Sequence, residues 1–355
     1  MGLAMPVVWS DSHRLHDPGA EIYVGVRTPG TELPDRVERI REALAGLDAR
    51  FVDAPSQPDD AVTSVHDPEL VRHLREAWSE WDDAGLRADP GQDDVVPYLF
   101  PHPDLFSGFE PRRASRITAR AGEFAYDTMT LVGPGTWEAA RAAVDAAVTA
   151  ADLVGQGAPA AYACTRPPGH HVTRRAYGGS CYLNNSAAAA ARLRAETDAP
   201  VAVIDVDAHH GNGTQAIFWD DETVLTGSVH VDPGAGWFPH FLGYEDEHGA
   251  AGSNRNVVVP EGAGDDRWVE AVTRLAAWAA ERGARALVVA LGVDAAGGDP
   301  ESPLAVTTAG FRAAGRALGS LELPTAVVQE GGYDLDAIGG LVSEFLTGME
   351  EEMNG

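Results

Sequence analysis

VAVIDVDAHHGNGTQ, residues 201–215, combines an apolar run with a cluster of carboxylates and imidazoles. It begins with a short β-branched run, 201–204, directly after a proline, which is typical of a buried parallel strand. Asp205, Asp207 and His209 then alternate along the chain, so they begin on one side of it. Open α/β sheets carry their chemistry at the carboxyl ends of strands, and aspartate with histidine is a ligand set suited to zinc. The alternative is a solvated helix cap, which matching parts elsewhere argue against.

The composition excludes several classes of protein. The 355 residues, 44% of them hydrophobic, can bury a large core, as one large α/β domain or two smaller ones. The formal net charge is −28, and every basic residue is an arginine. A field of this sign repels nucleic acid and anionic membranes and attracts cationic ligands, although a GC-rich genome or a salt adaptation gives the same composition. We therefore expect no nucleic-acid partner.

The cysteines and the termini point to the cytoplasm. Cys164 and Cys181 are too few for a disulfide framework, which fits a reducing compartment. The first fifteen residues have no basic segment followed by a long apolar core, so we expect no signal peptide. Pro6 stands where a myristoylation motif requires Ser or Thr, and no apolar run approaches the ~18 residues of a membrane span.

Apolar runs and helical periodicity alternate along the chain. We expect strands at 6–9, 50–52, 160–165, 201–204, 223–229, 256–259, 286–291 and 325–329. Helices are expected at 33–47, 67–81, 137–153 with Thr136 as the cap, 185–196, 265–282, 307–318 and 335–348, and residues 13–30 read as a loop. Strands that alternate with helices predict a parallel sheet covered on both faces. With no repeat and no linker, residues 1–355 form one predicted domain.

Residues 83–124 differ from the rest of that domain. They contain five prolines, several aromatic residues and little periodicity. A loop of this length in a compact domain is usually functional or a subunit contact. Simple disorder is the alternative, and the aromatic residues argue against it.

Four expected strand ends carry polar groups with complementary roles. Asp207, His209 and Asp294 are three protein ligands, which leaves the open position that a catalytic zinc keeps for water. The pair His170 and His171 can act as general base and acid. Tyr333, on a Gly-Gly turn, can donate to an oxyanion. Each part alone is commonplace, but together they predict hydrolysis of an amide or ester.

Four motifs carry a resemblance to a known family: RPPGHH (166–171), GGSCYLNN (178–185), DVDAHHGNGTQ (205–215) and EGGY (330–333). The chain resembles the histone deacetylase superfamily over nearly its whole length. A pattern at His13, Glu21-Ile22, Gly25 and 32–36, with GTWEAA at 135–140, is similar to the acetylpolyamine amidohydrolase branch.

This resemblance implies an arginase-like α/β fold with an eight-stranded parallel sheet. It implies zinc on Asp207, His209 and Asp294. It also implies that Asp205 holds His170 and helps to bind a structural K⁺ or Na⁺. The remaining ligands of that cation would be the backbone carbonyls of Asp207 and His209, together with Ser228 and Val229.

The resemblance also implies how substrate is held. The carbonyl of Gly179 would accept the substrate amide N–H, and Phe238 would line one wall of the tunnel. The proline-rich insertion at 83–124 resembles the loop that narrows the site and joins subunits in the polyamine branch, which implies a homodimer.

The sequence departs from the family pattern at three places. Asn212 stands where many members have an aspartate, which favours a less basic His171. Ser180 stands where an aromatic tunnel wall is usual, so we expect a wider or more polar channel. No acidic residues match those that bind the distal ammonium group of a polyamine in the family. Glu110 and Glu123 are candidates for this role, although a surface glutamate is the simpler interpretation of each.

Two rival functions fit the sequence less well. A two-metal ureohydrolase needs further bridging carboxylates, but Gly211 and Ala296 stand where these would be. A non-catalytic protein that binds acetylated ligands would be expected to lack a ligand or the tyrosine, whereas every role is filled here. The substrate stays open among an acetylated polyamine or similar small cationic amide, acetyl-lysine in proteins and an acylated secondary metabolite. The native metal stays open between zinc and ferrous iron.

Overall fold

The computed structural model describes residues 2–110 and 112–353 and is built on a parallel sheet of eight strands. The strand order is β4-β1-β5-β10-β9-β6-β7-β8, and each neighbouring pair is parallel. The strands are β1 (Val7–Trp9), β4 (Phe51–Asp53), β5 (Ala160–Ala163), β6 (Val201–Asp205), β7 (Val224–Val231), β8 (Asn254–Val259), β9 (Ala286–Leu291) and β10 (Thr325–Gln329).

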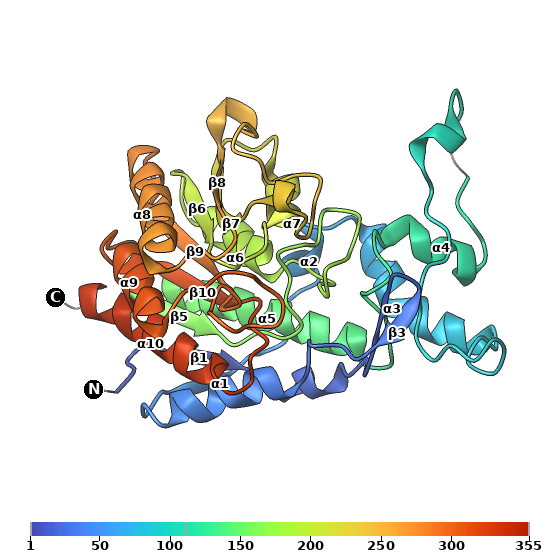
Figure 1. Cartoon of the computed structure of the whole chain (residues 1–355), viewed down its shortest axis with the longest axis horizontal. Helices are drawn as coiled ribbons and strands as arrows, with labels where there is room; N and C mark the ends of the chain where they lie inside the picture. The colour runs from blue at the N-terminus through green and yellow to red at the C-terminus, as the bar shows by residue number, and fades with distance from the viewer. Residues whose placement is uncertain (1, 111, 354–355) are drawn as a thin grey trace.

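Helices cover both faces of the sheet because alternate strand residues point to opposite sides. Ala202 and Ile204 of β6 pack into one core, whereas Val201 and Val203 pack into the other. The first core is closed by α1 (Asp35–Ala45), α8 (Asp265–Glu281), α9 (Thr308–Gly319) and α10 (Ile338–Met353). The second is closed by α3 (Pro68–Asp83), α5 (Thr136–Gly155) and α6 (Asn185–Arg194), with the shorter α2 (Asp60–Thr63), α4 (Ile117–Phe124) and α7 (Asn212–Phe218) (Figure 1). Within the described residues, no helix has the length and apolar character needed to cross a membrane.

The sequence predicted this architecture correctly, with errors in short elements. All eight strands and seven long helices lie within a few residues of their expected positions. The segment 13–30 is not simply a loop, since it contains the hairpin of β2 (Glu21–Tyr23) and β3 (Val26–Thr28), after a short 3₁₀ helix (Asp11–Leu15). The hairpin strands are largely exposed, so they lack the apolar alternation that would reveal them. Thr136 is also not the cap of α5: Gly135 is, in a left-handed conformation.

The insertion at 83–124 is more ordered than its sequence indicates. It contains a short 3₁₀ helix (Pro103–Phe106) and ends in α4, whose Ala121 and Phe124 pack into the second core. The stretch before α4 projects away from the sheet (Figure 1). One of the five prolines of this insertion, residue 111, lies outside the described residues.

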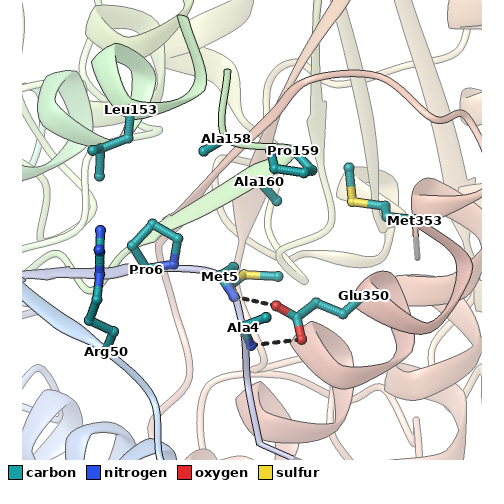
Figure 2. A pocket seen from close by; sticks show the side chains of 10 residues that line it. All are labelled: Ala4, Met5, Pro6, Arg50, Leu153, Ala158, Pro159, Ala160, Glu350 and Met353. Carbon is teal, nitrogen blue, oxygen red and sulfur yellow. Dashed lines mark hydrogen bonds between the residues drawn. The ribbon is translucent and has the colours of Figure 1, made fainter. Parts of the chain in front are cut away.

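A small cavity lies at the amino edge of the sheet, where Pro6 precedes β1 and Pro159 precedes β5 (Figure 2). The carboxylate of Glu350, from α10, accepts hydrogen bonds there from the backbone N–H groups of Ala4 and Met5. Parallel strands present their chemistry at the opposite, carboxyl edge. This cavity therefore belongs to the anchoring of the first residues against α10 and not to the predicted site.

Candidate active site

The four predicted strand ends meet at one edge of the sheet. They follow β5, β10, β9 and β6, which are consecutive neighbours in the strand order. All four strands run in the same direction, so the residues after them emerge side by side. The sequence predicted the polar groups at these ends, whereas their adjacency comes from the order of the strands.

Asp207, His209 and Asp294 form a compact cluster of potential metal ligands. One donor atom from each lies within 4.8 Å of the others. The Nδ1 atom of His209 is 3.2 Å from Oδ1 of Asp207 and 3.0 Å from Oδ2 of Asp294. Two carboxylates and one imidazole are donors that suit zinc or ferrous iron.

Backbone groups hold the two carboxylates of this cluster. The N–H of Gly331 donates to Asp207 Oδ2 at 2.8 Å, and the N–H of Ala208 donates to Asp294 Oδ1 at 2.8 Å. A Cβ atom on Gly331 would lie 2.4 Å from Asp207 Oδ2 and 2.6 Å from Asp294 Oδ2. Glycine is therefore required here because the carboxylates pack against the bare backbone of the EGGY segment.

The electrostatics of the cluster fit a cation. Burial, and next the neighbouring Asp207 carboxylate, raise the pKa of Asp294 to about 7. Burial opposes a charge on His209, but hydrogen bonds to Asp207 and Asp294 raise the pKa of its imidazole well above the ordinary value. Two buried carboxylates in contact need positive charge between them, and a divalent ion provides it.

A second group of possible donors, His170, Cys181 and Glu330, is a poorer metal site. The Glu330 carboxylate already accepts hydrogen bonds from the backbone N–H groups of Gly169 and His170 and from the Ser186 hydroxyl. Burial raises the pKa of the Cys181 thiol well above its ordinary value, so the thiolate that a metal requires is disfavoured. Glu330 therefore positions the turn that carries the two histidines.

His170 and His171 lie beside the metal cluster with different partners. The two rings have centroids 3.9 Å apart. The Nδ1 of His170 is 2.9 Å from Asp205 Oδ2, and its Nε2 is 3.8 Å from Asp207 Oδ2. The Nδ1 of His171 is 2.6 Å from Oδ1 of Asn212, an amide.

These partners shift the pKa values of the two imidazoles in opposite directions. Burial lowers the pKa of His170, but Asp205 and Asp207 outweigh burial and raise it to about 10. Burial, and next the charges of His170 and His209, hold the pKa of His171 well below its ordinary value. A neutral His171 that donates its Nδ1–H to the Asn212 carbonyl oxygen leaves its Nε2 lone pair free to accept a proton.

Tyr333 reaches the cluster on the loop that follows β10. Its backbone N–H donates to Asp299 Oδ2 at 2.7 Å, and the Arg36 guanidinium lies 4.5 Å from the centre of its ring. Arg36 also donates to the backbone carbonyls of Gly332 and Glu330. Burial raises the pKa of the Tyr333 hydroxyl well above 10, so this group is a proton-bearing donor at neutral pH.

Gly179 and Ser180 are the central residues of a tight turn. Their φ angles are +59° and +60°, and the N–H of Cys181 donates to the Gly178 carbonyl at 3.1 Å. Positive φ at both central residues defines a type I′ turn. Asp127 Oδ2 accepts the Gly179 N–H at 2.6 Å, so the orientation of the turn is set from outside it.

The other predicted site residues fall into three places. Phe238 packs edge-on against His171, with ring centroids 4.7 Å apart. Ser228 pairs with Asp205 across β6 and β7, and Val229 follows it on β7. Glu110 is exposed, and the Glu123 carboxylate accepts the Ala114 N–H at 2.7 Å; within the described residues, neither hydrogen bonds to the cluster above.

The sequence did not predict the buried acidic residues that hold the segments of the site in place. Glu32 is buried between Arg166, whose Nε lies 2.8 Å from Glu32 Oε1, and Arg36, whose nitrogen lies 2.7 Å from the same oxygen. Asp127 and Asp299 hold the Gly179 turn and the Tyr333 loop. Glu32 and Arg36 were part of the pattern matched to the family, but a buried ion network has no local sequence signal that reveals its partners.

Comparisons with known proteins agree with this geometry. The family model described as histone deacetylase domain matches residues 31–349. The acetylpolyamine amidohydrolase of Mycoplana ramosa is 37% identical over 97% of this chain and 99% of that protein. Acetylpolyamine amidohydrolase 1 of Pseudomonas aeruginosa is 36% identical over 97% and 98%.

Solved structures show the same relationship. The crystal structure of acetylpolyamine aminohydrolase from Burkholderia pseudomallei has a TM-score of 0.92 and 35% identity, covering 98% of this chain and 99% of that one. The HDA15 HD domain matches with a TM-score of 0.77 and 26% identity, over 98% and 91% of the two chains. The resemblance seen in the four motifs is thereby confirmed, and the chain belongs to the histone deacetylase family as an enzyme of the deacetylase and amidohydrolase type.

Proposed function

We propose that this enzyme is a zinc-dependent amidohydrolase that removes acetyl groups from acetylated polyamines or similar small cationic amides. The proposal rests on one observation: three potential metal ligands, Asp207, His209 and Asp294, lie beside two histidines with different partners. One histidine faces a carboxylate and the other faces an amide. A divalent ion held there supplies Lewis acidity to the amide carbonyl and to the attacking water. Ferrous iron fits the same donors, and metal analysis of the purified protein distinguishes the two.

His171 is the base in this mechanism. Its Nε2 accepts a proton from the attacking water, because Asn212 holds the Nδ1–H and burial keeps the ring neutral. His170, paired with Asp205, stays protonated and stabilises the negative charge that develops beside it. The proton on His171 then passes to the leaving amine nitrogen, which completes the hydrolysis.

Tyr333 and Gly179 orient the amide. The Tyr333 hydroxyl donates to the carbonyl oxygen as charge develops on it. The Gly179 carbonyl, fixed by the type I′ turn, accepts the substrate N–H. Phe238, packed against His171, forms one wall of the substrate channel beside the amide nitrogen.

Acidic groups near this site support a cationic substrate. The pKa of Glu21 is raised to about 7 by burial and next by Glu301, with a further contribution from Asp127. Glu301 also acts on Tyr333, where its charge raises the hydroxyl pKa. These carboxylates, and not Glu110 or Glu123, are the groups that we assign to attract a distal ammonium.

Turnover of a matched panel tests the proposal. Metal-loaded protein would be assayed for acetate release from N-acetylputrescine, N-acetylcadaverine, N-acetylspermidine and an acetyl-lysine peptide. A preference for the free amines of two or more orders of magnitude in kcat/KM is expected. Comparable peptide turnover would indicate a protein deacetylase. Binding without turnover of any compound would indicate an acylated secondary metabolite as the substrate or a non-catalytic binding protein.

We also propose a structural K⁺ or Na⁺ beside the site. Its ligands would be Asp205, the backbone carbonyls of Asp207 and His209, and Ser228 and Val229. The support is the buried pairing of Asp205 with Ser228 across two neighbouring strands. Loss of thermal stability on exchange of K⁺ and Na⁺ for tetramethylammonium would identify the cation's contribution.

We further propose a homodimer formed through the insertion, in the cytoplasm. Leu105 and Phe109, on the segment that projects from the sheet, are 60% and 65% exposed. Exposed apolar side chains of this kind mark interaction surfaces. Sedimentation would show a dimer that the double change L105E/F109E converts to a monomer, and a monomeric parent protein would contradict the proposal. The free, buried Cys164 and Cys181 are consistent with a reducing compartment.

A further inference from the structure

Gln329 is a buried polar residue at the end of β10, directly before the EGGY segment (330–333). Its side chain is fully buried, and the three residues before it on the strand, 326–328, are apolar. Burial of an amide costs free energy unless its oxygen and nitrogen find hydrogen-bond partners. The partners of this amide therefore show what the side chain does.

Tyr162, on the neighbouring strand β5, orients the amide of Gln329. The Tyr162 hydroxyl is also fully buried, and it donates to Gln329 Oε1 at 2.7 Å. Burial raises the pKa of this hydroxyl well above 10, so it keeps its proton at neutral pH. Because the amide oxygen accepts from the hydroxyl, the amide nitrogen and its two N–H groups face the other way.

The amide nitrogen faces the backbone of the EGGY segment. Gln329 Nε2 donates to the Gly331 carbonyl at 2.9 Å and lies 3.4 Å from the Glu330 carbonyl. The backbone N–H of Val293, which follows β9, donates to the same Gly331 carbonyl at 3.1 Å. Both lone pairs of this carbonyl are therefore occupied, and one of the two donors is a side chain whose direction Tyr162 sets.

Gly331 connects this amide to the metal cluster and to Tyr333. The N–H of Gly331 donates to Asp207 Oδ2 at 2.8 Å, while its carbonyl accepts from Gln329. The next residue, Gly332, has a φ of +121°. Neither glycine has a side chain to restrict its backbone, so contacts with its peptide groups must fix its position.

A purely structural role for Gln329 explains these contacts less well. Strands β5 and β10 are already joined by a parallel backbone ladder, and the Thr165 hydroxyl donates to the Gln329 carbonyl at 2.6 Å. Arg36 donates to the carbonyls of Glu330 and Gly332. The Gln329 amide supplies the side-chain donor for the carbonyl between them, so each of three successive carbonyls has a buried donor.

We propose that Gln329 is a positioning residue of the active site, whose amide, oriented by Tyr162, fixes the Gly331 backbone that supports Asp207 and leads to Tyr333. The inference rests on the proposed function, because it assigns Asp207 to the metal and Tyr333 to the amide carbonyl. Gln329 touches neither substrate nor metal. It acts on both through one glycine.

Replacement of the amide tests this role. Gln329→Met keeps a similar volume without an amide, so it should lower kcat for N-acetylputrescine and weaken zinc binding, each by about 10–100-fold, as loss of a residue that supports a metal ligand usually does. KM should change little, because no contact with substrate is lost. Competition with a chromophoric chelator measures the zinc affinity without turnover. Gln156→Met, the same change at an exposed glutamine after α5, is the control.

The double variant Tyr162→Phe with Gln329→Met separates positioning from stability. Each single change leaves one buried polar group without its partner and should lower the melting temperature, whereas the double change removes both groups and should restore it. The kcat and the zinc affinity should stay low in the double variant, because the Gly331 carbonyl still lacks the amide donor. Recovery of kcat together with the melting temperature would show that the pair only stabilises the fold.

Two outcomes distinguish failure of this inference from failure of the proposed function. Zinc affinity and kcat of Gln329→Met within about twofold of the parent values would overturn the inference, since a supporting residue should change both by more. If the parent protein hydrolyses no acetylated amine, the proposed function fails. The chelator competition then decides alone, and equal zinc affinity of the parent and the double variant would refute the role of Gln329.

Discussion

Individual side chains in this site depend on their exact neighbours. His170 and His171 are adjacent in the chain and have the same side chain, yet a carboxylate faces one and an amide faces the other. The pKa of the first imidazole is therefore raised and that of the second lowered, so His170 favours its charged form and His171 its neutral form. The contrast between them comes from the carboxylate of Asp205, at the end of β6, and the amide of Asn212, at the start of α7.

At the same scale, the Tyr333 hydroxyl should act on the transition state and not on the metal. Tyr333→Phe is expected to lower kcat by ~10²–10³, the usual loss for one oxyanion donor. Metal content should stay unchanged, because Asp207, His209 and Asp294 supply the clustered donors. Steady-state kinetics with metal analysis checks both, and Tyr98→Phe is the matched control. A near-normal rate would remove Tyr333 from the mechanism.

Gly331 should be as important to the metal as a ligand is. Gly331→Ala would place a Cβ atom 2.4 Å and 2.6 Å from carboxylate oxygens of Asp207 and Asp294. We expect loss of metal and activity together, measured by metal analysis of the purified variant. Gly340→Ala is the control, since Gly340 lies in α10 with no atom within 4 Å of its Cβ position. That change should be neutral or stabilising, by up to ~1 kcal/mol.

At the scale of elements, a buried ion network joins α1 to the loops after β5 and β10. Glu32 precedes α1, Arg36 lies in α1 and Arg166 follows β5. Arg36 extends the network to the backbone carbonyls of Glu330 and Gly332, which carry Tyr333. Burial opposes the charge on Glu32, but Arg166 and Arg36 outweigh it and keep the pKa of this carboxyl below its ordinary value. The network therefore holds the loop that carries Tyr333 from outside the sheet.

Removal of the charge at its centre should be costly. Glu32→Gln leaves two buried arginines with reduced compensation, so we expect the free energy of unfolding to fall by ~3–5 kcal/mol. Glu42→Gln in the same region is the control, because Glu42 pairs with Arg39 at the surface, where such pairs contribute ~0–1 kcal/mol. Denaturant unfolding measures both variants. A similar effect of the two changes would show that the buried network does not stabilise the fold.

At the scale of the whole molecule, the net charge is negative, and some of the acidic side chains lie close to one another. The net charge of −28 makes the whole protein attractive to polyamines. Glu301 and Asp127 come from distant parts of the chain, and both act electrostatically on Glu21. Only the folded molecule brings them together.

This arrangement predicts a pH-dependent preference for cationic substrates. Glu21 has its pKa raised to about 7, so it is charged above that pH and neutral below it. Glu21→Gln should raise KM for N-acetylputrescine at pH 8, with little effect at pH 6, where the parent carboxyl is already protonated. KM for the neutral N-acetylbutylamine should change little at either pH. Equal effects on both substrates would contradict an electrostatic role for Glu21.

The same pKa shift has a consequence for stability. The raised pKa means that the folded state favours the protonated Glu21 carboxyl. The contribution of this carboxyl to the free energy of unfolding is therefore fully present below the ordinary pKa of 4.5, and it is lost as the pH rises through about 7. Glu21→Gln should therefore melt at a higher temperature than the parent at pH 8. The difference should disappear at pH 4.

The strands, the long helices and the polar groups at four strand ends could be predicted from the amino-acid sequence alone. These features depend on neighbours in the chain, through apolar runs, helical periodicity and residue types that favour turns. The β2–β3 hairpin was not predicted because none of its strand residues is buried and the strands lack that periodicity.

Which of these segments meet in space depends on the packing of the whole fold. The order of the strands made β5, β10, β9 and β6 neighbours and so brought the predicted groups to one place. The same packing brought the rings of Tyr126 and Phe238 to 6.2 Å, placed Arg36 against the Tyr333 ring and left Glu110 exposed. Such contacts join residues more than a hundred positions apart, and they arise from the burial of whole helices and strands, which no local pattern records.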